Sequence, residues 1–148
     1  MAVAFANIFM SVEETEITYL SSNKPLVWKR HIDDIFSLWN IDKKDIGSFM
    51  ELANNHHPTI KFMSEISDTG ITFLDTYVYK GYSFKRESIL DVRTHFKPTE
   101  SFQYTEFSSC HSPGIRKGFI KGEALRLLRT NSSENTFEDN IRQFKRKL

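Results

Sequence analysis

The chain has 148 residues, of which 39% are apolar and 26% are charged, a composition that is typical of one globular domain and excludes a disordered chain. The net charge of +1 hides an asymmetry: residues 1–110 hold 11 Lys/Arg and 15 Asp/Glu, whereas residues 111–148 hold 9 and 4. The one cysteine, Cys110, excludes an internal disulfide framework and favours an intracellular protein of the nucleus or the cytoplasm. No apolar run is long enough to span a membrane.

The first part of the chain is predicted to be a helix followed by a β-hairpin. Residues 1–12 are apolar almost all round, as in a buried helix, and residues 16–20 are consistent with a short strand. Within residues 26–39, two apolar and aromatic runs flank Asp33 and Asp34, and aspartate tolerates the backbone angles of a tight turn. This pattern predicts an antiparallel hairpin with both carboxylates at its tip.

The middle of the chain is predicted to form one helix and several short strands. Asp42 is placed to cap a helix with one apolar stripe, which consists of Ile46, Phe49, Met50 and Ala53. A second hairpin is predicted over residues 59–79, around a turn at Ser67-Asp68-Thr69-Gly70. Two more short strands are predicted near residues 82–86 and 89–96.

The end of the chain is predicted to form two amphipathic helices. Pro113 opens the first, whose apolar positions are Ile115, Phe119, Ile120, Ala124, Leu127 and Leu128. Its basic residues belong either to a solvated face or to a surface that meets phosphates; they are Arg116, Lys117, Lys121, Arg126 and Arg129. Asn131-Ser132-Ser133 breaks the pattern and can cap a last helix that bears Phe137, Ile141, Phe144 and Leu148. The whole pattern predicts an α+β fold.

Two adjacent acidic residues at a hairpin tip are the sharpest chemical feature of the sequence. Neighbouring residues of a strand point to opposite faces, so Asp33 and Asp34 can converge on one ion only at a turn. A divalent cation offsets their repulsion, and Mg²⁺ is the usual partner when phosphates share the site. A pair of Mg²⁺ ions about 3.5–4 Å apart can activate a hydroxyl and stabilise a leaving oxygen. The alternative is a polar turn without chemistry.

The residues around this pair resemble a known family. Arg30-His31-Ile32-Asp33-Asp34-Ile35-Phe36 is similar to the Tyr-x-Asp-Asp box of reverse transcriptases. Further matches to the Penelope-like retroelement group occur in the order of that group: Ala6-Asn7-Ile8-Phe9-Met10, Trp28 and Arg30, His57-Pro58, Ile60-Lys61-Phe62, Phe73-Leu74-Asp75, Phe96-Lys97-Pro98-Thr99 and Ser108-Ser109-Cys110-His111-Ser112-Pro113. Each match alone is weak, but the ordered set covers nearly the whole chain.

The resemblance implies a fold and an activity. Residues 1–110 would be the C-terminal part of a polymerase palm, with β-hairpins packed on helices, and residues 111–148 the start of a helical thumb. The activity would be RNA-directed DNA polymerisation by nucleotidyl transfer with Mg²⁺, or with Mn²⁺. The partners would be an RNA or DNA template–primer and a deoxynucleoside triphosphate.

The resemblance also implies roles for particular residues. Asp33 and Asp34 would be the catalytic metal ligands. Phe73-Leu74-Asp75 falls where such enzymes place the hairpin that holds the primer end. Contacts with nucleic acid are expected from a set of mostly basic residues: Arg30, His31, Lys97, Arg116, Lys117 and Lys121.

Two departures from the family bear on activity. The tyrosine of the box is His31 here, which keeps a flat ring but loses the phenol, so packing and contact near the primer terminus would differ from those of the family. The first catalytic aspartate and the nucleotide-gripping fingers of the family precede the helix with which the resemblance begins. We therefore expect the chain to be inactive alone, unless that upstream segment acts in trans. The alternative is a non-catalytic nucleic-acid-binding or interaction module derived from a retroelement.

Two other motifs are weaker. A zinc site could draw on His56, His57, His95, Cys110 and His111, but no two of them have the spacing of a zinc motif. Asn131-Ser132-Ser133 is formally a glycosylation acceptor, and we interpret it instead as the break and cap between two helices.

Overall fold

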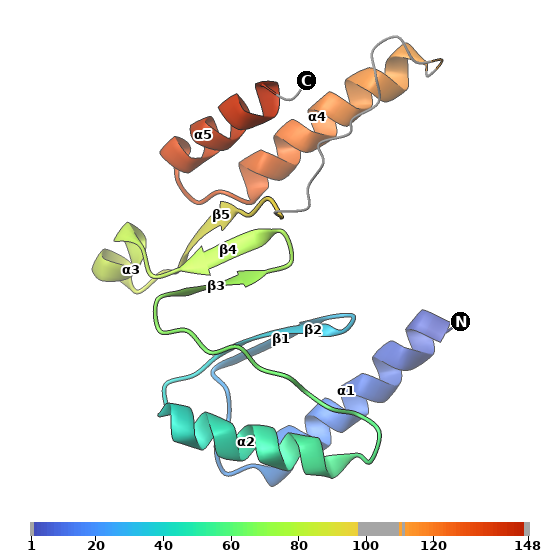
Figure 1. Ribbon diagram of the computed structural model, residues 1–148, viewed down its shortest axis with the longest axis vertical. Helices are drawn as coiled ribbons and strands as arrows, with labels where there is room; N and C mark the ends of the chain where they lie inside the picture. The colour runs from blue at the N-terminus through green and yellow to red at the C-terminus, as the bar shows by residue number, and fades with distance from the viewer. Residues whose placement is uncertain (1, 98–109, 111, 147–148) are drawn as a thin grey trace. The chain divides into compact units, whose positions relative to one another are not determined.

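The computed structural model describes residues 2–97, 110 and 112–146 (Figure 1). Within these residues the chain is an α+β protein with five helices and five strands, and the strands form two small antiparallel sheets. None of the described helices is both long and apolar enough to cross a membrane. The chain divides into two compact units, Met1–Ile66 and Ser67–Leu148, which are described separately.

The first unit contains one hairpin and two helices: α1 (Ala2–Leu20), β1 (Val27–His31), β2 (Asp34–Leu38) and α2 (Lys43–His56). β1 and β2 pair from Val27 opposite Leu38 to His31 opposite Asp34. The predicted hairpin, with the two aspartates at and beside its turn, is therefore confirmed.

The core of the first unit lies where the hairpin meets the helices. Phe49 of α2 is only 2% exposed and packs with Ile17 of α1. Its ring meets the rings of Trp28 and Trp39 edge-on, at centroid distances of 5.7 and 4.9 Å. The predicted helix and its buried stripe are confirmed, but the side chain of Asp42 makes no capping hydrogen bond. Aromatic packing thus fixes the hairpin against α2.

Helix α1 differs from the sequence prediction in two ways. It continues to Leu20, so the strand predicted at residues 16–20 is wrong. The hydroxyls of Thr15 and Thr18 donate to carbonyls one turn earlier, which accommodates these β-branched residues in the helix. The expected burial of its first part is also wrong, since Phe5 is 72% and Ile8 67% exposed. A groove of about 630 Å³ lies against this face, lined by Asn7, Ile8, Ser11, Val12, Thr15, Glu16 and Arg30.

The second unit contains a three-stranded sheet and three helices: β3 (Gly70–Phe73), β4 (Thr76–Tyr79), α3 (Tyr82–Glu87), β5 (Asp91–Thr94), α4 (Pro113–Arg129) and α5 (Glu134–Lys145). The sheet order is β3-β4-β5. Two predictions are wrong here. The second predicted hairpin turns at Leu74-Asp75 instead, and residues 59–66, which belong to the first unit, form no strand. Residues 82–86 lie in helix α3. The strand predicted within residues 89–96 is confirmed as β5.

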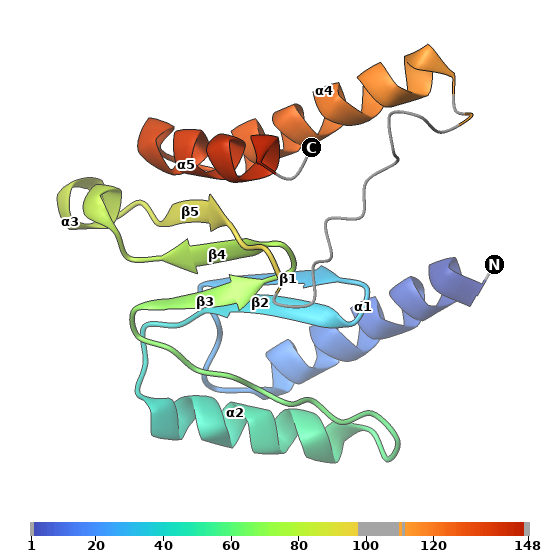
Figure 2. The ribbon, with the colours of Figure 1, turned by 45° about the horizontal axis from the view of Figure 1, so that its top comes forward.

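The two C-terminal helices form as predicted and lie beside each other (Figure 2). The Ser133 hydroxyl accepts from the backbone N–H of Thr136 at 3.3 Å and caps α5. The side-chain amide of Asn131 donates to the carbonyl of Leu127 at 2.7 Å and closes the end of α4, as the break-and-cap interpretation expects. Leu127 and Phe144 are fully buried, but Ile115 is 56% exposed, so its predicted packing is wrong.

Candidate functional site

Asp33 lies in a strained two-residue turn, and Asp34 is the first residue of the strand that follows it. Ile32 and Asp33 join the paired residues His31 and Asp34, and Ile32 has φ 57° while Asp33 keeps a negative φ. A positive φ at the first central position alone is the pattern of a type II′ turn. A β-branched residue in that conformation is an outlier that costs on the order of 1–3 kcal/mol. Strain of this kind persists only where surrounding contacts hold the backbone.

The strain at Ile32 makes a testable prediction. We expect Ile32→Gly to be more stable than Ile32→Ala by about 1 kcal/mol, because glycine adopts a positive φ without a Cβ clash. The alanine variant also lacks the side chain, so it separates relief of strain from loss of contacts. Urea unfolding of the two variants measures the difference. Equal stabilities would show that the turn is unstrained.

The register of the hairpin separates its two faces. Directly opposite residues of an antiparallel pair share a face, so His31 and Asp34 point to one side. Trp28 and Arg30 belong to the other side, where they meet α2 and α1. The side chains of His31, Asp33 and Asp34 are exposed. A cation and its ligands can therefore reach the two carboxylates from solvent.

Arg30 fastens the turn to helix α1. Its Nε donates to Glu14 Oε1 at 2.8 Å, and its Nη1 donates to Asn7 Oδ1 at 2.8 Å. The same Nη1 donates to the carbonyl of Ile32 at 3.1 Å. The side chain is only 12% exposed. Contact with a phosphate, as the sequence predicts for Arg30, would require these bonds to open, whereas a positioning role uses them as they stand.

The predicted primer-holding segment forms a second turn of the same design. Leu74 has φ 56°, and Leu74-Asp75 joins the paired residues Phe73 and Thr76. The Thr76 hydroxyl donates to the Phe73 carbonyl at 2.8 Å, and the backbone N–H of His95 donates to the Asp75 carbonyl at 2.8 Å. Both candidate segments are thus tight turns in which an apolar residue with positive φ precedes an aspartate.

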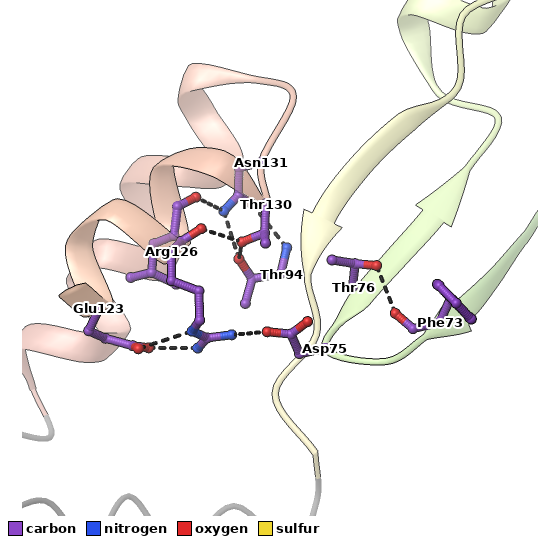
Figure 3. A network of polar contacts seen from close by, with 9 residues as sticks. Phe73, Asp75, Thr76, Thr94, Glu123, Arg126, Thr130 and Asn131 are labelled. Atoms are coloured by element: carbon purple, nitrogen blue, oxygen red, sulfur yellow. Dashed lines mark hydrogen bonds and ion pairs between the residues drawn. The ribbon is translucent and has the colours of Figure 1, made fainter. Parts of the chain in front are cut away.

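Arg126 of α4 holds this second turn (Figure 3). Its Nη1 donates to Asp75 Oδ2 at 2.6 Å, and its Nε and Nη2 donate to both carboxylate oxygens of Glu123. The hydrogen bond with Glu123, followed by that with Asp75, raises the pKa of Arg126 above its usual range, although partial burial opposes the rise. The guanidinium therefore stays charged. Figure 3 also shows the neighbouring bonds that join Thr94 of β5 to Thr130 and Asn131.

The remaining predicted nucleic-acid contacts are described only in part. Lys117 and Lys121 are exposed on α4, and Lys97 is exposed after β5. The side chain of Arg116 lies outside the described residues, as do Pro98, Thr99, Ser108, Ser109 and His111 of the family-like motifs. Lys97, Lys117 and Lys121 belong to the second unit, whereas the Asp33-Asp34 turn belongs to the first.

Metal-binding clusters can be assessed among the side chains that the structure describes. These side chains include no cluster of three or more His, Cys, Asp or Glu residues placed to hold a metal. His56 instead lies near two carboxylates of α1, with its Nε2 3.1 Å from Glu16 Oε2 and 3.5 Å from Glu13 Oε2. At the turn, Asp33 and Asp34 offer two oxygen ligands of the kind that Mg²⁺ prefers.

Sequence reasoning missed the residues that hold the two turns. Asn7 and Glu14 reach Arg30 across 23 and 16 residues, and Asp75 meets Arg126 across 51. Short motifs carry no signal for such pairs, although an arginine placed two residues before a turn is a reasonable candidate for bonding its carbonyl.

Comparison with known proteins adds no assignment: no family model, curated protein or solved structure matches this chain.

Proposed function

We propose that the chain is a fragment of a retroelement reverse transcriptase that carries the Asp-Asp turn of the polymerase palm. One observation supports the proposal most: Asp33 and Asp34 lie at an exposed two-residue turn that Arg30 fastens to the preceding helix. The ordered family-like motifs around the turn add to it. The strain at Ile32 and the largely buried arginine that bonds its carbonyl hold the turn in one conformation, as a ligand-binding turn requires.

The residues of the turn fit a magnesium site in part. Asp33 and Asp34 would each offer a carboxylate oxygen, and His31 shares the face of Asp34. When bound, Mg²⁺ would favour attack by a primer 3′-hydroxyl and stabilise the leaving phosphate oxygen. Mg²⁺ prefers six oxygen ligands, so water, substrate phosphates and other protein groups would complete the shell. In the family, the aspartate of an earlier strand is one of those groups.

The second unit would bind the template–primer. The turn at Phe73-Leu74-Asp75 would lie against the primer end, and α4 would follow the duplex as part of a thumb. The exposure of Lys117 and Lys121 on α4 supports the second assignment. Contacts of this kind give affinity for phosphates without reading sequence.

Cation binding tests the site directly. We expect Mn²⁺ to bind the purified chain weakly, and Asp33→Asn/Asp34→Asn to abolish that binding, because the carboxylates are its ligands. Electron paramagnetic resonance of free Mn²⁺ during a titration measures this. The matched control is Asp42→Asn/Asp45→Asn, which removes two exposed carboxylates at the start of α2. If the control pair abolishes binding as well, or the turn pair leaves it intact, the assignment of the turn is wrong.

Primer extension tests the extent of the activity. We expect the purified chain to show no template-dependent extension with Mg²⁺ or Mn²⁺, because two carboxylates hold only part of a two-metal site. Extension that disappears in Asp33→Ala would contradict this expectation.

A non-catalytic nucleic-acid-binding module is the second candidate. The charge of the second unit favours it, since residues 67–148 hold 14 Lys/Arg and 10 Asp/Glu, whereas residues 1–66 hold 6 and 9. Nucleic-acid binding that persists without divalent cations, in a chain that binds no Mn²⁺ at the turn, would favour this candidate over the first.

A further inference from the structure

The sheet of the second unit has two chemically different faces. Because opposite residues share a face, one face consists of two mostly apolar rows, which are Ile71, Val78 and Val92, and Phe73, Thr76 and Thr94. Thr94 on this face is bonded to the junction between α4 and α5. The other face also has two rows, which are Thr72, Tyr77 and Arg93, and Gly70, Tyr79 and Asp91. The second face is aromatic and polar.

Two tyrosine rings and a guanidinium lie together on this second face. The rings of Tyr77 and Tyr79 are nearly parallel, with an interplanar angle of 22° and centroids 5.6 Å apart. The guanidinium carbon of Arg93 lies 4.9 Å from the Tyr77 centroid and 5.7 Å from the Tyr79 centroid. Arg93 and Thr72 are exposed at the two sides of this row. The two half-buried rings and the exposed guanidinium therefore form one aromatic surface that carries a positive charge.

Gly70 leaves room for the end of the Tyr77 ring to lie over β3. A Cβ at position 70 would stand 2.7 Å from Tyr77 Oη and 2.6 Å from Tyr79 Cβ, both too close for real atoms. At the end of the same face, Asp91 accepts from the hydroxyl of Ser83 at 2.7 Å and from its backbone N–H at 3.0 Å. The Ser83 hydroxyl bond holds the pKa of Asp91 below its usual value. This carboxylate is therefore ionised at neutral pH, and Ser83 is its hydrogen-bond partner. Neighbouring contacts thus fix the shape of the aromatic face.

We propose that Tyr77, Tyr79 and Arg93 form a stacking platform for single-stranded nucleic acid. Unpaired bases stack on aromatic rings and on guanidinium planes, whereas the bases of a duplex are already stacked on one another. The excess of basic residues in the second unit complements a polyanion, which an apolar partner would not use. The platform requires no metal and neither Asp33 nor Asp34, so it is independent of the proposed polymerase site.

Oligonucleotide binding tests the platform. The probes are a labelled oligouridine of about twelve nucleotides, which spans a typical single-strand site, and a labelled duplex of similar length. Fluorescence anisotropy at low salt with EDTA present excludes any metal-dependent contact. We expect the wild-type chain to bind oligouridine more tightly than the duplex. Tyr77→Leu and Arg93→Ala should each weaken oligouridine binding about fivefold or more, because each removes a stacking surface.

Two further variants make the result specific. Tyr77→Phe keeps the ring and should bind within about twofold of wild type, which also shows that the sheet tolerates a change at this position. Arg142→Ala removes the same charge from α5, where the guanidinium is 63% exposed and paired with Glu138, and should also stay within about twofold.

Three results would overturn the platform. One is undetectable oligouridine binding by the wild-type chain at low salt, which would instead favour a protein-facing surface. Another is an equal loss in Arg142→Ala and Arg93→Ala, which would show that bulk charge alone binds the probe. The third is a preference for the duplex that Tyr77→Leu leaves unchanged.

Discussion

Replacing Phe49 by alanine is expected to lower the free energy of unfolding by about 3–5 kcal/mol. Phe49 is 2% exposed and packs against Trp28 and Trp39, so its removal leaves a cavity between the hairpin and α2. Urea unfolding followed by tryptophan fluorescence measures the loss, since both tryptophans touch the deleted ring. Phe5→Ala is the matched control, because Phe5 is 72% exposed and its loss should change stability by less than about 0.5 kcal/mol. Equal effects of the two substitutions would contradict the assigned core.

The second large effect is expected at Arg30. Arg30→Ala should lower the free energy of unfolding by about 2–3 kcal/mol, because it leaves the largely buried carboxylate of Glu14 without its charged partner. Arg30→Lys keeps the charge but replaces the separate Nε and Nη1 donors to Glu14, Asn7 and the Ile32 carbonyl with a single nitrogen. We therefore expect Arg30→Lys to weaken Mn²⁺ binding at the turn several-fold while the chain remains folded.

The sign of the change in cation affinity separates two roles for Arg30. If Arg30 acted only as a nearby positive charge, Arg30→Ala would strengthen cation binding and Arg30→Lys would leave it unchanged. If Arg30 positions the turn, both variants weaken binding. Glu14→Gln is the control, because it removes the negative charge that pairs with Arg30 and leaves the bond to the Ile32 carbonyl in place. It should lower stability with little effect on Mn²⁺ affinity, and a large loss of affinity would contradict the positioning role.

The first hairpin was predictable because its sequence is unambiguous at short range. Two apolar runs flank Asp33-Asp34, and no other residues between Val27 and Leu38 favour a turn. Helix α2 was predictable for a similar reason, since its apolar positions fall on one face. In both segments, local pattern and tertiary packing agree.

The second hairpin was predicted in the wrong place because its turn chemistry is unusual. Ser67-Asp68-Thr69-Gly70 has the composition of a turn, but Gly70 is the first residue of β3. The actual turn contains Leu74, a residue that rarely adopts a positive φ. Contacts distant in sequence hold it there, through the bonds from His95 and Arg126 to Asp75. A sequence pattern does not register strain that tertiary contacts maintain.

The chemistry of the candidate site was predicted only as far as single motifs reach. Asp33 and Asp34 stand at the turn as the sequence indicates, but Arg30 faces α1 rather than solvent. Its orientation follows from the strand register, which places Arg30 on the face opposite His31 and Asp34. Which side of the hairpin the helices cover depends on long-range packing, and the sequence alone does not specify it.

The fork of Arg126 has a mechanical consequence. The guanidinium donates through Nη2 to Glu123 on its own helix and through Nη1 to Asp75 at the hairpin turn. The arginine therefore links α4 directly to the turn. A rotation of α4 about its axis would either move the Asp75 carboxylate as well or break the ion pair between Arg126 Nη1 and Asp75 Oδ2, which are 2.6 Å apart. A displacement of α4 would accordingly be transmitted to the turn between β3 and β4.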